Sequence, residues 1–188
     1  MESNPRSRNR LDLYLPDFQW KTYHSLVSTA DRQVCFDALV NETIQSPLIR
    51  LLVRLRGMNT GGSLRDFFEQ NGFTLLEEDA PGFLVFGMIC RPWRIGGSRI
   101  TMTEAKEWFS TPSQDHAMLV TAMGTMGEAT GRTLLYTETR IKVEDKNLRR
   151  RFAIYWFLIR PFSAIIRRLW LTSAKRIAEM RAVSSRFT

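Results

Sequence analysis

Residues 132–177 have the sequence RTLLYTETRIKVEDKNLRRRFAIYWFLIRPFSAIIRRLWLTSAKRI, and this stretch decides the fold class. From Arg132 to Glu144 apolar and polar residues alternate, which predicts a β-strand with one buried face and one wet face. From Phe152 to Ile177 apolar residues recur at helical spacing for about seven turns, which predicts a long C-terminal helix. Pro161 lies inside this pattern, so we expect it to kink the helix or to divide it in two.

The residues before this stretch predict a first strand and then short helices. Residues 17–29 have an extended pattern that suits the strand. Asp31, Ser46 and Ser63 each precede a short helical pattern and are expected to cap its N-terminus. The third of these helices is expected to stop at Asn71-Gly72.

From Phe73 onwards the pattern becomes extended, which predicts an antiparallel sheet. The extended runs cover residues 73–78, 83–90, 99–110 and 117–126. Residues 83–90 are apolar on both faces, apart from one glycine, and are expected to form a covered central strand. This order predicts a single α+β domain over residues 17–181. A flexible lead (residues 1–16) precedes it, and a short tail (residues 182–188) follows it.

The formal net charge of +8 is concentrated at one end of the chain. Residues 146–188 contain eleven Lys and Arg and one acid, a balance of +10, whereas the first 145 residues carry −2. Three interpretations are open: a solvated helix face, contact with an anionic membrane, or nucleic-acid binding. We favour the solvated face, and we do not expect nucleic acid because neither a helix-turn-helix nor an aromatic stacking platform is evident. Membrane or anion contact would use Arg167, Arg168, Lys175 and Arg176.

A second apolar stripe runs along the same predicted helix. Its members are Ile154, Leu158, Phe162, Ile165 and Leu169. A helix that is apolar over more than half of its circumference must touch two surfaces. The stripe therefore predicts either packing on the early helices or a homodimer contact.

Sparse residue types exclude several classes of protein. Cys35 and Cys90 lie 55 residues apart among apolar neighbours, which predicts buried free thiols and a reducing, cytoplasmic compartment. The longest apolar run, residues 152–159, is far shorter than the ~20 residues of a membrane span. No secretory signal is visible. The two histidines lie far apart, and the sequence contains neither a glycine-rich phosphate loop nor a nucleophile elbow. We therefore expect no bound metal and no cofactor, and no residue is indicated as catalytic.

Two adjacent motifs resemble a known superfamily. A strand that reads Thr137-Glu138-Thr139-Arg140-Ile141 is followed by Arg149-Arg150-Arg151-Phe152 and then by Tyr155-Trp156-Phe157-Leu158-Ile159-Arg160-Pro161. With the element order, this resembles an uncharacterised bacterial branch of the START-like, or SRPBCC, superfamily, which includes polyketide cyclase-like proteins. The resemblance implies a helix-grip fold: a curved antiparallel sheet grips the long C-terminal helix and leaves a hydrophobic cavity between them. The superfamily holds carriers, receptors and enzymes, so function must be judged from the site.

Given that fold, the sequence predicts a binding site for a small hydrophobic molecule of lipid or polyketide type. Small hydroxyls among apolar side chains suit a mostly hydrophobic ligand with a few polar atoms, and methionine suits an adaptable pocket. The alternative is an ordinary core with no cavity left. The expected ligand-binding residues are Met123, Leu135, Thr137, Thr139, Tyr155 and Ile159.

Two other functions stay open at this point. One is a cyclase- or dehydratase-like enzyme in the same cavity, for which His24, Tyr23 and Glu104 are the first candidates. The other is an interaction protein with a filled core whose helix docks on a partner.

Two charged clusters have a functional and a structural interpretation. Glu138 and Arg140 would be an acid–base or anion-binding pair, or a surface ladder on the wet side of the sheet, which we favour. Residues 77–79 are acidic and would bind a metal or form a solvated turn, which we again favour.

Overall fold

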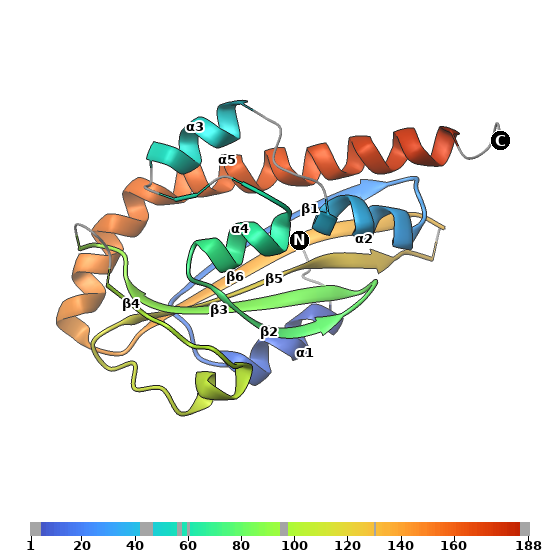
Figure 1. Ribbon diagram of the computed structural model, residues 1–188. Helices are drawn as coiled ribbons and strands as arrows, with labels where there is room; N and C mark the ends of the chain where they lie inside the picture. The colour runs from blue at the N-terminus through green and yellow to red at the C-terminus, as the bar shows by residue number, and fades with distance from the viewer. Residues whose placement is uncertain are drawn as a thin grey trace.

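The computed structural model describes residues 5–41, 47–55, 58–59, 61–94, 98–129 and 131–184. It is an α+β fold built on a curved, unclosed antiparallel sheet (Figure 1). The sheet runs in the order β1 (Trp20–Ser28), β6 (Thr133–Val143), β5 (Ala117–Gly127), β3 (Phe83–Arg91) and β2 (Thr74–Asp79), and the short strand β4 (Ser98–Ile100) also pairs with β3. As predicted, β3 is a central strand, paired on both sides and buried over most of its length.

One face of the sheet is covered by the long C-terminal helix and three short helices (Figure 1). These are α5 (Lys146–Ser184), α2 (Arg32–Asn41), α3 (Pro47–Leu55) and α4 (Leu64–Gln70). Figure 1 shows α5 changing direction in its first half, where Pro161 removes a backbone N–H from the helix, as the sequence predicts. The helix continues to Ser184, beyond residue 181, the predicted end of the domain.

The caps of the short helices follow the predictions where they are described. Asp31 Oδ1 accepts a hydrogen bond from the backbone N–H of Gln33 at 2.8 Å. Ser63 forms a reciprocal capping box with Asp66 at the start of α4. Gly72, with φ +81°, takes the chain out of α4. The expected cap at Ser46 lies outside the described residues.

The other face of the sheet is covered by two elements that the sequence analysis did not predict. Helix α1 (Pro5–Tyr14) occupies most of the region expected to be a lead without regular structure. The 3₁₀ helix η1 (Ala105–Phe109) and the short β4 stand where a strand over 99–110 was predicted, so that prediction is wrong for most of its length. Leu11 and Leu15 from the α1 region and Trp108 from η1 pack as one buried cluster against the sheet.

The covering of this face corrects the prediction of a wet side on β6. Tyr136, Glu138 and Arg140 are all buried there, with Glu138 at 0% exposure. The prediction that Glu138 and Arg140 form a solvent-exposed charge ladder is therefore wrong. The pair lies in the interior, beneath α1.

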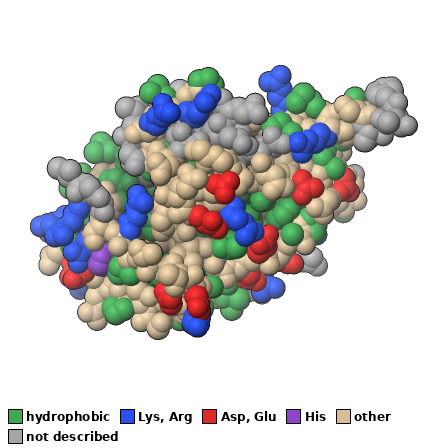
Figure 2. Space-filling model, in the orientation of Figure 1, with side chains coloured by type: hydrophobic (Ala, Val, Ile, Leu, Met, Phe, Trp, Pro, Cys, Tyr) green, Lys and Arg blue, Asp and Glu red, His purple; other side chains and the backbone are tan. Residues whose placement is uncertain are grey.

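Basic side chains are spread over the face that Figure 2 shows. Blue Lys and Arg side chains lie along its upper edge, over α3 and α5, and others lie at the left side and among the red acidic side chains over the sheet and the short helices. Among the described residues, no helix is both long enough and apolar enough to cross a bilayer.

Candidate ligand-binding site

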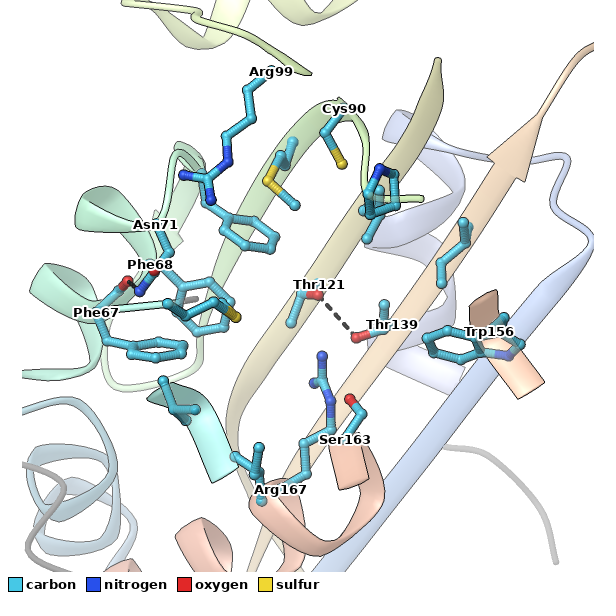
Figure 3. A pocket seen from close by; sticks show the side chains of 18 of the residues that line it. Phe67, Phe68, Asn71, Cys90, Arg99, Thr121, Thr139, Trp156, Ser163 and Arg167 are labelled. Atoms are coloured by element: carbon cyan, nitrogen blue, oxygen red, sulfur yellow. Dashed lines mark hydrogen bonds between the residues drawn. The ribbon is translucent and has the colours of Figure 1, made fainter. Parts of the chain in front are cut away.

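A cavity of about 340 Å³ lies between the sheet and α5 (Figure 3). It divides the packed interior on this side of the sheet. One hydrophobic cluster, which contains Met123 and Trp170, lies at one end of the cavity, and a second, which contains Phe152 and Trp156, lies at the other. Residues from both clusters form its walls, so the cavity separates the two clusters.

The sheet contributes a floor with one polar spot. Alternation along β5 and β6 turns Leu119, Thr121 and Met123 toward α5, with Thr139 and Ile141 opposite them. Thr121 and Thr139 are directly paired across the strands, and their buried hydroxyls share a hydrogen bond of 2.8 Å. The floor therefore offers two hydroxyl oxygens within an otherwise apolar surface (Figure 3).

Aromatic rings form the wall on the α4 side. Phe68 stacks on Phe86 of β3 with ring centroids 4.5 Å apart, and Phe67 meets Trp170 of α5 edge-on at 5.3 Å. Asn71 lines the cavity too, but its side chain is engaged by the backbone: Nδ2 donates to the carbonyl of Phe67 at 2.7 Å, and Oδ1 accepts from the N–H of Asn59 at 2.8 Å. We therefore assign Asn71 to fixing the end of α4 rather than to the ligand.

The cavity has a positively charged lining. Arg94, Arg99 and Arg167 line it, and none of the described lining residues is Asp, Glu or His. Arg94 and Arg99 are the exposed members of the lining, so the cavity meets the surface beside them.

Arg167 reaches the interior from α5. Figure 3 shows its guanidinium beside Ser163 and pointing toward Thr139. Its Nη1 donates to Thr137 Oγ1 at 2.5 Å. A guanidinium next to three hydroxyl groups, in a cavity without carboxylates among its described residues, favours a ligand with an acidic or carbonyl oxygen.

The structure brings half of the predicted ligand-binding residues to the cavity. Met123, Thr139 and Tyr155 line it, whereas Leu135, Thr137 and Ile159 do not. Leu135 is packed into the core between β6 and the helices, and the hydroxyl of Thr137 holds Arg167.

The four basic residues that were predicted to contact a membrane do not lie together on one surface. Arg167 turns inward, which corrects its expected place on a surface contact. Arg168 and Arg176 are exposed. Lys175 is half-buried, with its Nζ 3.8 Å from Glu179 Oε1.

The candidates for catalysis lie outside the cavity. His24 sits on β1, half-buried on the α5 side, and its pKa is lowered first by burial and then by Arg167, Arg168 and Arg160. Tyr23 points to the other face, where its ring stacks with Tyr136 at 6.5 Å. Glu104 is exposed and pairs with Lys106, Nζ to Oε2 at 2.6 Å.

Of the acidic residues 77–79, Glu77 and Glu78 are held by basic and phenolic partners. Glu77 pairs with Arg10 at 2.9 Å and accepts a hydrogen bond from Tyr14 Oη at 3.1 Å, while Glu78 pairs with Arg65. No group of three or more His, Cys, Asp or Glu within the described part of the chain has a geometry that could hold a metal ion.

Glu138 and Arg140 form a buried network that holds α1 against the sheet. Glu138 Oε1 accepts from Arg140 Nε and lies near Lys21 Nζ, at 3.0 Å in each case. Arg140 Nη1 also pairs with Asp12 of α1, and the guanidinium lies 4.7 Å from the ring centroid of Phe18. This network lies on the α1 side of the sheet, away from the cavity, and its contacts are structural.

No protein-family model matches the chain, and no curated protein matches it. The site is therefore judged on its own geometry.

Proposed function

We propose that the protein binds a small lipophilic molecule, of lipid or polyketide type, in the cavity between the sheet and α5. The observation that carries the proposal is a cavity of about 340 Å³ that extends from the surface beside Arg94 and Arg99 into the space between two packed clusters. Packed interiors leave few voids larger than a water molecule, whereas ligand pockets measure about 300–1,000 Å³. A void of this size favours a bound molecule over a filled core.

The lining indicates how such a molecule would be oriented. Its apolar part would lie along the aromatic wall and over Met123, where each Å² removed from water contributes roughly 25 cal/mol. Its acidic or carbonyl oxygen would lie beside Arg167 and the hydroxyls of Thr121, Thr139 and Ser163. A lipophilic acid is thus the ligand class that suits both parts of the lining.

We propose binding rather than catalysis because the described lining has no His, Asp or Glu, the side chains that most often act as general acids and bases. The placement of a cavity between a curved sheet and a C-terminal helix supports the proposed kinship with START-like proteins. Cys35 and Cys90 are buried and form no disulfide with each other, which supports the proposed cytoplasmic location.

Native mass spectrometry of the full chain purified from cells, followed by organic extraction, tests the proposal. The expected result is an adduct that a denaturing solvent releases as a lipophilic acid. A Ser163→Trp variant should abolish the adduct, because residue 163 lines the cavity and an indole there occupies its space.

Ser173→Trp is the matched control, since it places the same side chain at an exposed position on the same helix. It should keep the adduct and the thermal stability of the wild type. The proposal would be contradicted if the adduct persisted unchanged in Ser163→Trp. It would also be contradicted if the wild-type protein carried no adduct and no lipophilic acid raised its thermal stability.

A further inference from the structure

The first half of α5 exposes a row of large apolar side chains on its outward side. Their exposed fractions lie between 44% and 79%. They are spaced three or four residues apart, with Phe157 beside the row, and therefore share one side of the helix. We call this set the outer stripe of α5: Ile154, Phe157, Leu158, Phe162 and Ile165.

The outer stripe lies outside the hydrophobic clusters that the described residues form. The opposite side of the same turns supplies Phe152, Trp156, Ile166 and Trp170 to the core and to the cavity wall. A helix packed on one side is normally polar on the side that faces water. Five large apolar groups on the outward side mark an interaction surface.

The charged residues that α5 itself places around the outer stripe are basic. Arg150, Arg151, Arg160 and Arg168 are exposed on the same part of α5. No Asp or Glu occurs between Lys146 and Ala178. The surface therefore needs an occupant that is apolar at its centre and anionic around it.

A second copy of the chain does not meet this requirement. In a twofold dimer the same patch faces itself, so these arginines would oppose one another with no carboxylate in the patch to separate them. An anionic bilayer meets both parts: apolar side chains of an interfacial helix enter the acyl boundary, and arginines extend to the lipid phosphates.

We propose that the outer stripe of α5 and its arginines dock the protein on the surface of an anionic lipid bilayer. The helix lies in the plane of the interface and does not cross the membrane. This docking is independent of whether the cavity is filled. It would bring the cavity wall formed by Tyr155, Ser163 and Arg167, which belongs to the same turns, to within one helix diameter of the lipid.

Flotation of the full chain with phosphatidylcholine vesicles, with and without phosphatidylglycerol, tests the docking. The wild type should float with the vesicles that contain phosphatidylglycerol and should be released by high salt. Replacing both Phe157 and Leu158 by Ser should weaken this binding by about tenfold or more. Replacing both Arg150 and Arg151 by Gln should weaken it about tenfold or more while binding to neutral vesicles stays unchanged.

Phe109→Ser is the matched control, because Phe109 is 68% exposed but belongs to η1 on the opposite face of the sheet. It should bind vesicles as the wild type does. Equal binding to neutral and anionic vesicles, or full binding by the Phe157→Ser, Leu158→Ser double variant, would overturn the proposal. So would a stable dimer in solution that this double variant converts to a monomer, since the occupant would then be a second copy of the chain.

Discussion

Replacing Arg167 by Met removes the only interior arginine of the described cavity lining while keeping most of its apolar stem. In the wild type the guanidinium lies among Thr137, Ser163 and Thr139, within reach of an acidic group in the cavity. A hydrogen bond between charged partners contributes about 1.5–3 kcal/mol, and 1.4 kcal/mol is a factor of ten. Arg167→Met should therefore weaken binding of a lipophilic acid by about 10- to 150-fold.

The assay compares two ligands that differ only in the polar end. Titration calorimetry with decanoic acid and with decanol gives the affinity of each for the wild type and for the variant. The alcohol carries no charge, so its affinity should change by less than about threefold. Arg160→Met is the control for loss of a positive charge, because Arg160 is exposed on the same helix and does not line the cavity.

The reasoning is refuted if the acid and the alcohol lose affinity equally, because Arg167 would then matter only for the shape of the cavity. It is also refuted if neither loses affinity, because the acidic group would then lie elsewhere. Urea denaturation of the variant separates either result from a loss of folded protein.

Three further outcomes follow from contacts outside the cavity. Arg140→Met leaves the buried carboxylate of Glu138 with Lys21 as its remaining basic partner, so the free energy of unfolding should fall by about 3 kcal/mol in urea denaturation. A loss below about 1 kcal/mol would place the pair in solvent. Gly124→Ala should lower the melting temperature, because the new Cβ would overlap the carbonyl oxygen of Gly82, whereas Gly127→Ala, with open space around it, should not; equal shifts would contradict the packing. Burial and nearby arginines lower the pKa of His24, so unfolding takes up a proton as the pH falls below about 6.5 and stability should drop there. His24→Leu should show a smaller drop between about pH 7 and 5.5, and an unchanged drop would contradict the burial.

Much of the fold could be predicted because its signals are local. The alternation in β6, the helical spacing of α5 and the caps at Asp31 and Ser63 depend on residues close to one another in the chain. Local periodicity is what decides between strand and helix, so these elements appear where they were expected.

Helix α1 could not be predicted because its burial depends on distant residues. Its sequence is polar, with three arginines in the first ten residues, and Leu11, Tyr14 and the following Leu15 are the described apolar residues there that pack against the sheet. One of the contacts that anchor it joins Asp12 to Arg140, which is 128 residues away. The same contact explains the wrong prediction of a wet face on β6, since charged residues that find partners in the interior look identical in sequence to solvated ones.

The candidate site was predicted in outline because strand alternation identifies the inward residues Thr139 and Met123. The α4 wall was missed because nothing local indicates which cluster Phe67 and Phe68 join. Arg167 was placed on the surface with its basic neighbours. Its spacing of four residues from Ser163 was the available signal, because both then lie on the side of the helix that faces the sheet.

Photo-crosslinking with a diazirine-bearing fatty acid tests the central claim, that the cavity is the binding site, most directly. Peptide mapping by mass spectrometry should place the adducts on lining residues such as Met123, Phe152 and Trp156, and unlabelled decanoic acid should suppress them. Adducts confined to the outer stripe of α5, or labelling that excess decanoic acid does not reduce, would contradict the claim.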